Sequence, residues 1–206
     1  MENGTLSIAA GDTTGTITIA NIVDDTIDET DETVIVTLSS PSNASLGSDK
    51  VHTYTITDDD DQPEISFNVT TSSGSESISS TAITVNLSSA SSNDITVNYA
   101  VSGSAIGSGT DYTLADGTLT INAGETSASI VISGIIDDLS SEGNETVILT
   151  LSAPNNATLG GDNVHTYTIN DNDGTPTIAF SEITSNNLES VSSTSIEISI
   201  PFASEV

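Results

Sequence analysis

The sequence repeats itself after 113 residues. Val51–Ile56 and Val164–Ile169 both read Val-His-Thr-Tyr-Thr-Ile, and the same offset relates Pro63 to Pro176. Self-similarity at a fixed period is typical of tandem arrays in which each repeat folds as one structural unit. We therefore predict a modular chain with short connections between its modules. The expected units are the C-terminal half of a repeat at residues 1–61, a complete repeat at 62–174, and the N-terminal strands of a third repeat at 175–206.

Each repeat has the pattern of a series of short β-strands. Val, Ile and Leu alternate with Thr and Ser, which is the period of half-buried strands, and no stretch has helical periodicity. About seven such strands in about 100 residues predict an all-β protein of tandem Ig-like antiparallel β-sandwich repeats. The expected strands are Thr5–Ile8, Thr16–Ile22, Thr33–Leu38 and Val51–Thr57, then Glu64–Val69, Ala82–Leu87, Asp94–Val101, Thr118–Ile121, Ala128–Ile136, Thr146–Leu151 and Val164–Asn170.

The charge of the chain argues against several classes of partner. Thirty acidic residues stand against one Lys and no Arg, which gives a net charge of −29. Nucleic acids and anionic membrane surfaces are bound through basic patches, so neither is an expected partner. No apolar run is long enough to insert into a membrane as a helix, and no signal peptide follows Met1. Cys is absent, so disulfides do not stabilise the fold.

One loop concentrates the negative charge. Asp137, Asp138, Glu142 and Glu145 lie within nine residues with no cation nearby, and a similar loop occurs at residues 24–32. When such a loop is ordered, its carboxylates must be solvated, protonated or bridged by a metal. Carboxylate and carbonyl oxygens are the ligands that calcium prefers, whereas zinc and copper prefer Cys and His. The loop therefore favours calcium (Ca2+).

Other interpretations of these residues are weaker. An acidic surface that serves hydration alone is an alternative, but these acids gather at strand ends and in the linker instead of over strand faces. His52 and His165 lie inside expected strands, which favours a structural role. No Ser, His and Asp form a recognisable triad. Glu142 and Glu145 as an acid and base acting on a sugar lack an aromatic platform nearby, so no enzymatic activity is expected.

Four motifs follow one another through the complete repeat: Gly109-Thr110-Asp111-Tyr112, the run 117–126, Ile136-Asp137-Asp138 and Asp171-Asn172-Asp173. Together they resemble the Calx-beta domain, a calcium-binding sandwich of sodium/calcium exchangers, integrin β4 and bacterial surface proteins. In the complete repeat the resemblance implies the ligands Glu76, Asp111, Asp137, Asp138, the Ser140 carbonyl, Glu142, Glu145, Asp171 and Asp173. The 113-residue offset gives the matching set Asp24, Asp25, the Ile27 carbonyl, Glu29, Glu32, Asp58 and Asp60. Because Asn172 interrupts the acidic run, we expect fewer or weaker ions than a fully acidic member binds.

The expected ligands belong partly to the sandwich and partly to the linker, so calcium is predicted to stiffen the joint between repeats. We expect a structural or adhesive module of a large extracellular or cell-surface repeat protein. Its expected partners are calcium ions, neighbouring repeats and a surface protein or glycan. The alternatives are a calcium-sensing regulatory module and an acidic carbohydrate- or protein-binding module without a metal. Unpaired strand edges in the two partial repeats also predict head-to-tail association of chains.

Overall fold

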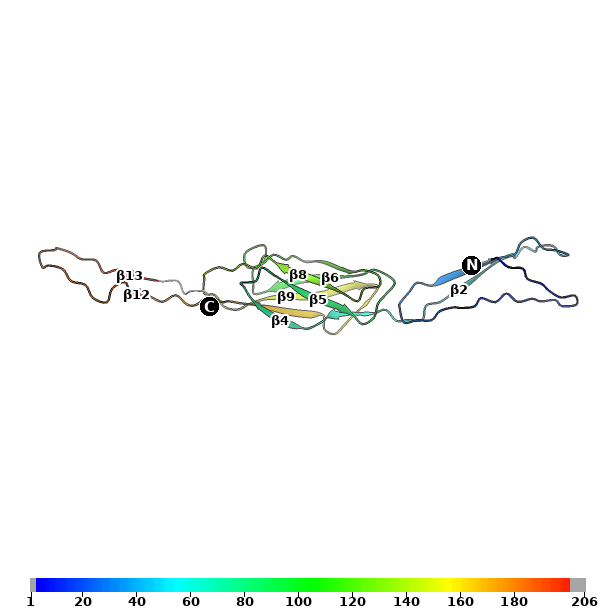
Figure 1. Cartoon of the computed structure of the whole chain (residues 1–206), viewed down its shortest axis with the longest axis horizontal. Coiled ribbons are helices and arrows are strands. Elements are labelled where there is room, and N and C mark those ends of the chain that lie inside the picture. Colours follow the sequence, from blue (N-terminus) through cyan, green and yellow to red (C-terminus); the bar gives the residue numbers. More distant parts are fainter. Residues whose placement is uncertain (1–2, 201–206) are drawn as a thin grey trace.

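The computed structural model describes residues 3–200, and this part of the chain contains strands and no helix. Figure 1 shows an elongated molecule, with a two-layered sandwich in the middle and a thin two-stranded ribbon on each side. The predicted all-β sandwich class is confirmed. Residues 1–2 and 201–206 of the two predicted partial repeats lie outside the described residues. Within the described residues, no helix is long and apolar enough to cross a membrane.

The central sandwich consists of two sheets with the strand orders β10-β3-β5-β8 and β4-β11-β9-β6-β7. Most neighbours are antiparallel, but β10 pairs with β3 and β11 with β4 in parallel. The first sheet contains β3 (Glu64–Phe67), β5 (Ser80–Leu87), β8 (Ser127–Ser133) and β10 (Thr158–Leu159). The second contains β4 (Thr71–Ser75), β6 (Ile95–Gly103), β7 (Gly117–Ile121), β9 (Glu145–Asn155) and β11 (Val164–Asn170).

An aliphatic core fills the space between the two sheets. Alternate side chains of strands such as β5, β9 and β11 point inward, as the period-two pattern predicts. Ile65 and Val85 from one sheet, and Val147 and Leu149 from the other, are fully buried. Burial of such side chains stabilises the sandwich by about 1.5–3 kcal/mol each. The alternating pattern read from the sequence therefore corresponds to one continuous core in the central repeat.

The sequence pattern missed β4 and β10 and extended β8 too far. β4 reads Thr-Ser-Ser-Gly-Ser and has no apolar side chain, so its position at a sheet edge leaves no hydrophobic signal. The predicted strand through Ile136 ends at Ser133, because Gly134 takes a φ of +58° and turns the chain. Ile135 is buried after this turn, whereas Ile136 is 45% exposed. The turn directs the following acidic loop over the end of the sandwich.

In the first partial repeat only two of the four predicted strands form. β1 (Glu32–Thr37) and β2 (Val51–Ile56) pair in antiparallel fashion, whereas Thr5–Ile8 and Thr16–Ile22 form no ladder. The counterparts of these two segments, at the 113-residue offset, are β7 and β8, which pair with β6 and β5. Residues 3–61 contain no counterpart of β5 or β6, so the two segments have no partner strand within this repeat.

The C-terminal ribbon is the shortest part of the structure. β12 (Ala179–Phe180) and β13 (Ile198–Ser199) pair in antiparallel fashion. Phe180 and Ile198, which correspond to the buried residues Phe67 and Val85 at the 113-residue offset, are 61% and 55% exposed. The ribbon thus carries core-type side chains without a second sheet to cover them.

Candidate metal centre

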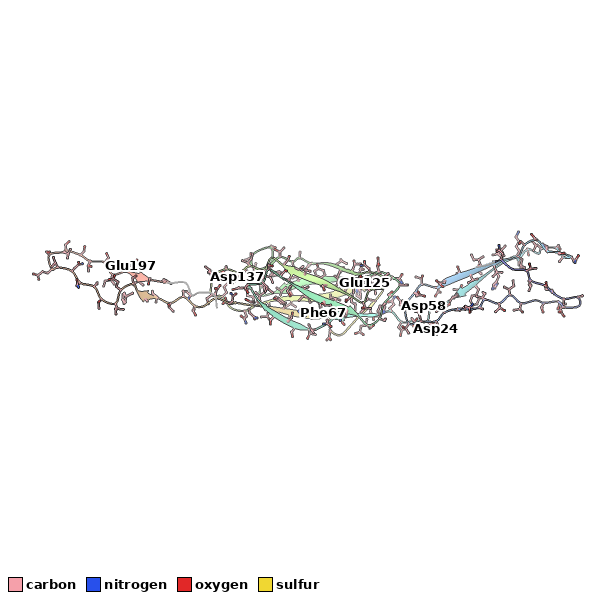
Figure 2. All side chains as sticks on the ribbon, viewed as in Figure 1. Asp24, Asp58, Phe67, Glu125, Asp137 and Glu197 are labelled. Carbon is pink, nitrogen blue, oxygen red and sulfur yellow. The ribbon has the colours of Figure 1, made fainter. Side chains whose placement is uncertain are left out.

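The predicted ligands of the complete repeat gather at one end of the central sandwich. Figure 2 shows Asp137 at the end that faces the C-terminal ribbon, while Asp24 and Asp58 lie beyond the opposite end, toward the N-terminal ribbon. Four segments meet at the Asp137 end. They are the residue after β4, the loop between β6 and β7, the loop between β8 and β9, and the residues that follow β11.

Glu76, Asp171 and Asp173 form the tightest part of this centre. One carboxylate oxygen from each lies within 4.8 Å of the other two. The parallel pairing of β4 with β11 explains why they meet, because its register places Ser75 opposite Asn170. Glu76 and Asp171 are the next residues of the two strands and therefore leave the sheet side by side. This pairing of distant segments cannot be read from the spacing of the acids in the sequence.

Backbone amides donate hydrogen bonds to two of the three carboxylates, those of Glu76 and Asp171. The Glu76 amide donates to the Asn170 carbonyl at 3.1 Å, and the Asn172 amide donates to Glu76 Oε1 at 3.3 Å. The Asp173 amide donates to Asp171 Oδ1 at 3.0 Å. Burial raises the pKa of Glu76, against the lowering effect of the Asn172 amide, and the charges of Asp171 and Asp173 add to the rise. The negative charges of Asp171 and Asp173 thus disfavour ionisation of the Glu76 carboxyl.

Both carboxylate oxygens of Asp173 are inaccessible to solvent and have no hydrogen-bond partner. Burial, reinforced by the charges of Asp171, Asp137 and Asp138, raises the pKa of this carboxyl above its ordinary value. Buried polar atoms in folded proteins nearly always have a partner, and an unpaired carboxylate is strongly disfavoured. A cation between Asp173 and its neighbours would satisfy these oxygens. The residues present therefore fit a metal ion.

Glu145 and Asp111 form a second pair of acids beside this cluster. The pKa of Glu145 is raised to about 7, chiefly by burial and then by a hydrogen bond to the Asp111 side chain and the charges of Asp111, Glu142 and Glu76. The turn before β7 holds Asp111 in place, because the Ile106 amide donates to Asp111 Oδ2 at 2.6 Å. The Glu145 carboxyl therefore keeps its proton more readily than a free carboxyl does when no cation lies beside it.

The loop between β8 and β9 forms the exposed margin of the centre. Asp137, Asp138, Ser140 and Glu142 are all exposed. The Ser140 amide donates to Asp138 Oδ1 at 2.6 Å, and the Glu142 amide donates to Asp171 Oδ2 at 2.8 Å. The Glu142 contact joins the loop to the linker. These residues surround the tight cluster of Glu76, Asp171 and Asp173 but do not belong to it, and the Ser140 carbonyl stays a predicted ligand.

The first repeat builds its acidic loop with the same hydrogen bonds at the 113-residue offset. The Ile27 amide donates to Asp25 Oδ1 at 2.8 Å, as Ser140 does to Asp138, and the Glu29 amide donates to Asp58 Oδ2 at 3.0 Å, as Glu142 does to Asp171. The loop therefore keeps its shape without a complete sandwich beside it.

This first loop encloses a small acidic cavity of about 60 Å³, whose lining includes Asp24, Asp25, Glu29, Glu32, Asp58 and Asp60. Burial raises the pKa of Glu29, and the charges of Asp25, Glu32, Asp58 and Asp60 add to the effect. Burial and the charges of Asp58 and Asp59 do the same to the pKa of Asp60. The Ile27 carbonyl stays a predicted ligand, and residues 1–61 hold no counterpart of Glu76 or Asp111.

Asn144 contacts the linker beside the centre, and the sequence reasoning missed this contact. Its Oδ1 accepts a hydrogen bond from the Asp171 amide at 3.3 Å. In the first repeat, Asp31 Oδ1 accepts from the Asp58 amide at 3.1 Å. An oxygen-bearing side chain at both positions of the repeat was the available signal. The side chain thus binds the backbone of the linker residue whose carboxylate belongs to the centre.

The donor set consists of oxygens. No thiol is present in the chain, and His165 is buried away from the centre, with Nε2 2.8 Å from Ser72 Oγ and Nδ1 2.7 Å from the Val69 carbonyl. The predicted structural role of His165 is therefore confirmed. Several carboxylates in a flexible arrangement are typical of calcium, which takes six to eight oxygens, whereas magnesium demands a stricter octahedron and retains water.

Comparison with known proteins identifies the fold. The family model of the Calx-beta domain matches residues 2–60 and 58–173. Among solved structures, CBD12 from CALX1.2 is similar, with 22% identity, a TM-score of 0.50, and coverage of 58% of this chain and 48% of that chain. The calcium binding domain CBD12 of CALX1.1 has 24% identity and a TM-score of 0.50, with coverage of 57% of this chain and 48% of that chain.

The apo form of the Calx CBD1 domain is also similar, with 22% identity, a TM-score of 0.50, and coverage of 55% of this chain and 100% of that chain. At these identities the structures show a shared fold alone. The chain spans about half the length of the two CBD12 structures. No curated protein sequence matches it.

Proposed function

Because the chain belongs to the Calx-beta domain family, we propose that it is a calcium-binding structural module of an extracellular or cell-surface repeat protein. The observation that carries this proposal is the Asp173 carboxylate, whose two oxygens are buried without a partner beside Glu76 and Asp171. A related structure is described as a calcium binding domain. Modules of this family bind and regulate instead of catalysing, so the proposed role involves no reaction.

Calcium bound at this centre would join two parts of the chain. Glu76 belongs to the sandwich, because it directly follows β4, whereas Asp171 and Asp173 belong to the segment that leads out of it. A single ion held by all three fixes the direction in which the chain leaves the module. The proposed consequence is a rod that is stiff with calcium and loose without it, suited to a spacer or an adhesive stalk.

The test is a calorimetric calcium titration of the whole chain. We expect saturable binding in the native chain and a lower stoichiometry in the Asp171→Asn, Asp173→Asn variant. Glu182→Gln is the matched control, because it removes one charge from the exposed C-terminal ribbon, away from both acidic loops. A native chain that takes up no calcium at millimolar concentration would overturn the proposal.

Two other functions remain as distinct outcomes. A calcium sensor is favoured over a stalk if calcium changes the affinity of the chain for a separate protein while leaving the angle between modules unchanged. A carbohydrate- or protein-binding module without a metal is favoured if glycan or protein binding persists in a chelator. The extracellular or cell-surface location is part of the proposal, and surface labelling of intact cells tests it.

A further inference from the structure

The acidic loop of the first repeat docks onto the central sandwich through Asp28. Asp28 is 8% exposed and Ser91 is 1% exposed. Ser91 Oγ donates to Asp28 Oδ2 at 3.0 Å, and the Ser92 amide donates to the Asp28 carbonyl at 3.0 Å. The two segments also form a parallel β-bridge between Asp28 and Ser91. A hydrogen bond to a carboxylate is about twice as strong as a neutral one, and burial strengthens it further.

The receiving surface, which we call the serine pad (Ser91 and Ser92), is firmly part of the sandwich. The Gly124 amide donates to the Ser91 carbonyl at 2.9 Å, which ties the β5–β6 loop to the β7–β8 loop. The Asn93 amide donates to Ser91 Oγ at 3.2 Å. Gly124, which bonds to the pad, precedes Glu125, and Figure 2 labels Glu125 toward the N-terminal ribbon, at the end of the sandwich opposite Asp137. A group bound to the pad is therefore bound to the rigid body of the module.

On its other side, Asp28 is connected directly to the candidate ligands of the first loop. Its neighbours in the chain are Ile27 and Glu29. The Ile27 amide donates to Asp25 Oδ1 at 2.8 Å, and the Glu29 amide donates to Asp58 Oδ2 at 3.0 Å. A calcium ion held by Asp25 and Asp58 would therefore also fix the backbone on both sides of Asp28.

The contact gives the first joint a second point of attachment. The covalent connection runs through residues 57–63, where Pro63 is fully buried and its carbonyl accepts the Thr158 amide at 2.9 Å. A module held at one point can rotate about that point. A second point, between Asp28 and the serine pad, removes most of this rotation. The angle between the modules then depends on whether the 24–32 loop is ordered.

We propose that Asp28 is a positioning residue that transmits calcium binding in the first loop to the orientation of the following module. This inference rests on the proposed calcium-binding function and adds the residue and the surface through which the joint is set. It applies to the first joint, because Ser141 takes the place of Asp28 in the second loop at the 113-residue offset. The second joint therefore lacks the carboxylate, and the two joints are expected to differ in stiffness.

The experiment measures the angle between the modules and calcium binding in parallel. Spin labels are placed at Thr53→Cys in β2 and Ala100→Cys in β6, which are exposed positions in a chain without native Cys. Double electron–electron resonance gives the distribution of distances between the labels in calcium and in chelator, and calorimetry gives the affinity and stoichiometry. Asp28→Ala and Ser91→Ala each remove one side of the contact, whereas Asp28→Asn keeps an oxygen that accepts from Ser91.

In the native chain, calcium should narrow the distance distribution. The Asp28→Ala and Ser91→Ala variants should bind the same number of calcium ions, but calcium should no longer narrow their distance distributions. In the Asp28→Asn variant calcium should narrow the distribution again. By linkage, Asp28→Ala should also weaken calcium binding by roughly fivefold. If the Asp28→Ala variant binds calcium and its distance distribution narrows as in the native chain, the positioning role of Asp28 is wrong and the proposed function stands. If the native chain binds no calcium, both the proposed function and the transmission through Asp28 are overturned.

Discussion

The pairing of Asp111 with Glu145 predicts that calcium uptake releases protons in a pH-dependent manner. Burial and the Asp111 side chain raise the pKa of Glu145 to about 7. Calcium requires ionised carboxylates, so a bound ion displaces this proton. With a pKa of about 7, the carboxyl is about nine-tenths protonated at pH 6 and about one-tenth protonated at pH 8. This group should therefore release about 0.9 proton at pH 6 and about 0.1 at pH 8.

The same pKa also determines how the calcium-free chain responds to pH. Between its ordinary value of 4.5 and about 7, the Glu145 carboxyl is protonated in the folded chain and ionised in the unfolded chain. The folded state then binds more protons than the unfolded state. The contribution of Glu145 to the free energy of unfolding is therefore fully present below pH 4.5 and is lost as the pH rises through 7. The difference between the two pKa values, 4.5 and about 7, corresponds to about 3.4 kcal/mol at 1.36 kcal/mol per pKa unit. Solvent screening of this partly exposed group reduces the loss to about 1–2 kcal/mol.

Calorimetric calcium titrations in two buffers of different ionisation enthalpy count the released protons at each pH. The native chain should release more protons at pH 6 than at pH 8, and Glu145→Gln should lose the part due to this group. Glu182→Gln, in the C-terminal ribbon, should behave as the native chain. Chemical denaturation without calcium should show a fall in the free energy of unfolding from pH 5 to pH 8. Equal proton release at both pH values in the native chain would refute the reasoning.

The remaining predictions concern stability and association. Calcium at a hundredfold excess over its Kd should add about 2.7 kcal/mol to the free energy of unfolding, and identical melting curves in calcium and in chelator would contradict ion binding. Leu149→Ala, in the fully buried core, should cost about 2–5 kcal/mol in denaturant unfolding. Gly134→Ala should lower the free energy of unfolding by about 1–2 kcal/mol, because φ is +58° and a Cβ there would lie 3.0 Å from Thr113 Oγ1. An unchanged midpoint of denaturant unfolding would show that the turn relaxes. Phe180→Asp should reduce self-association in light scattering, because Phe180 is 61% exposed; a native chain that stays monomeric at high concentration would contradict head-to-tail association.

The fold class was predictable because two independent signals in the sequence agree. The alternation of Ile, Val and Leu with Thr and Ser reports one buried face per strand, and the repeated Val-His-Thr-Tyr-Thr-Ile segment reports the modular architecture. β4 was not predictable in this way, because an edge strand of Thr, Ser and Gly buries no apolar side chain. The pattern at Thr16–Ile22 was present, but its alternation alone could not show that the partner strands of a sandwich lie outside the partial repeat.

For the candidate site, the resemblance implied which residues converge at one end of the sandwich but not which of them lie closest together. The resemblance implied nine ligands in the complete repeat, and the structure brings Glu76, Asp171 and Asp173 together most closely. That grouping depends on the parallel register of β4 with β11, which no local pattern encodes. The buried contact between Asp28 and Ser91 was invisible for a related reason, since it joins residues 63 positions apart in two different repeats.

The parallel pairing of β4 with β11 has a mechanical consequence. Five residue pairs, from Thr71 opposite Thr166 to Ser75 opposite Asn170, connect a strand near the entry of the module to the strand at its exit. Tension along the array pulls these strands past each other in opposite directions, so the load falls on all of their hydrogen bonds at once. Rupture then requires the whole ladder to shear together, whereas a hairpin pulled at its open end unzips one bond at a time.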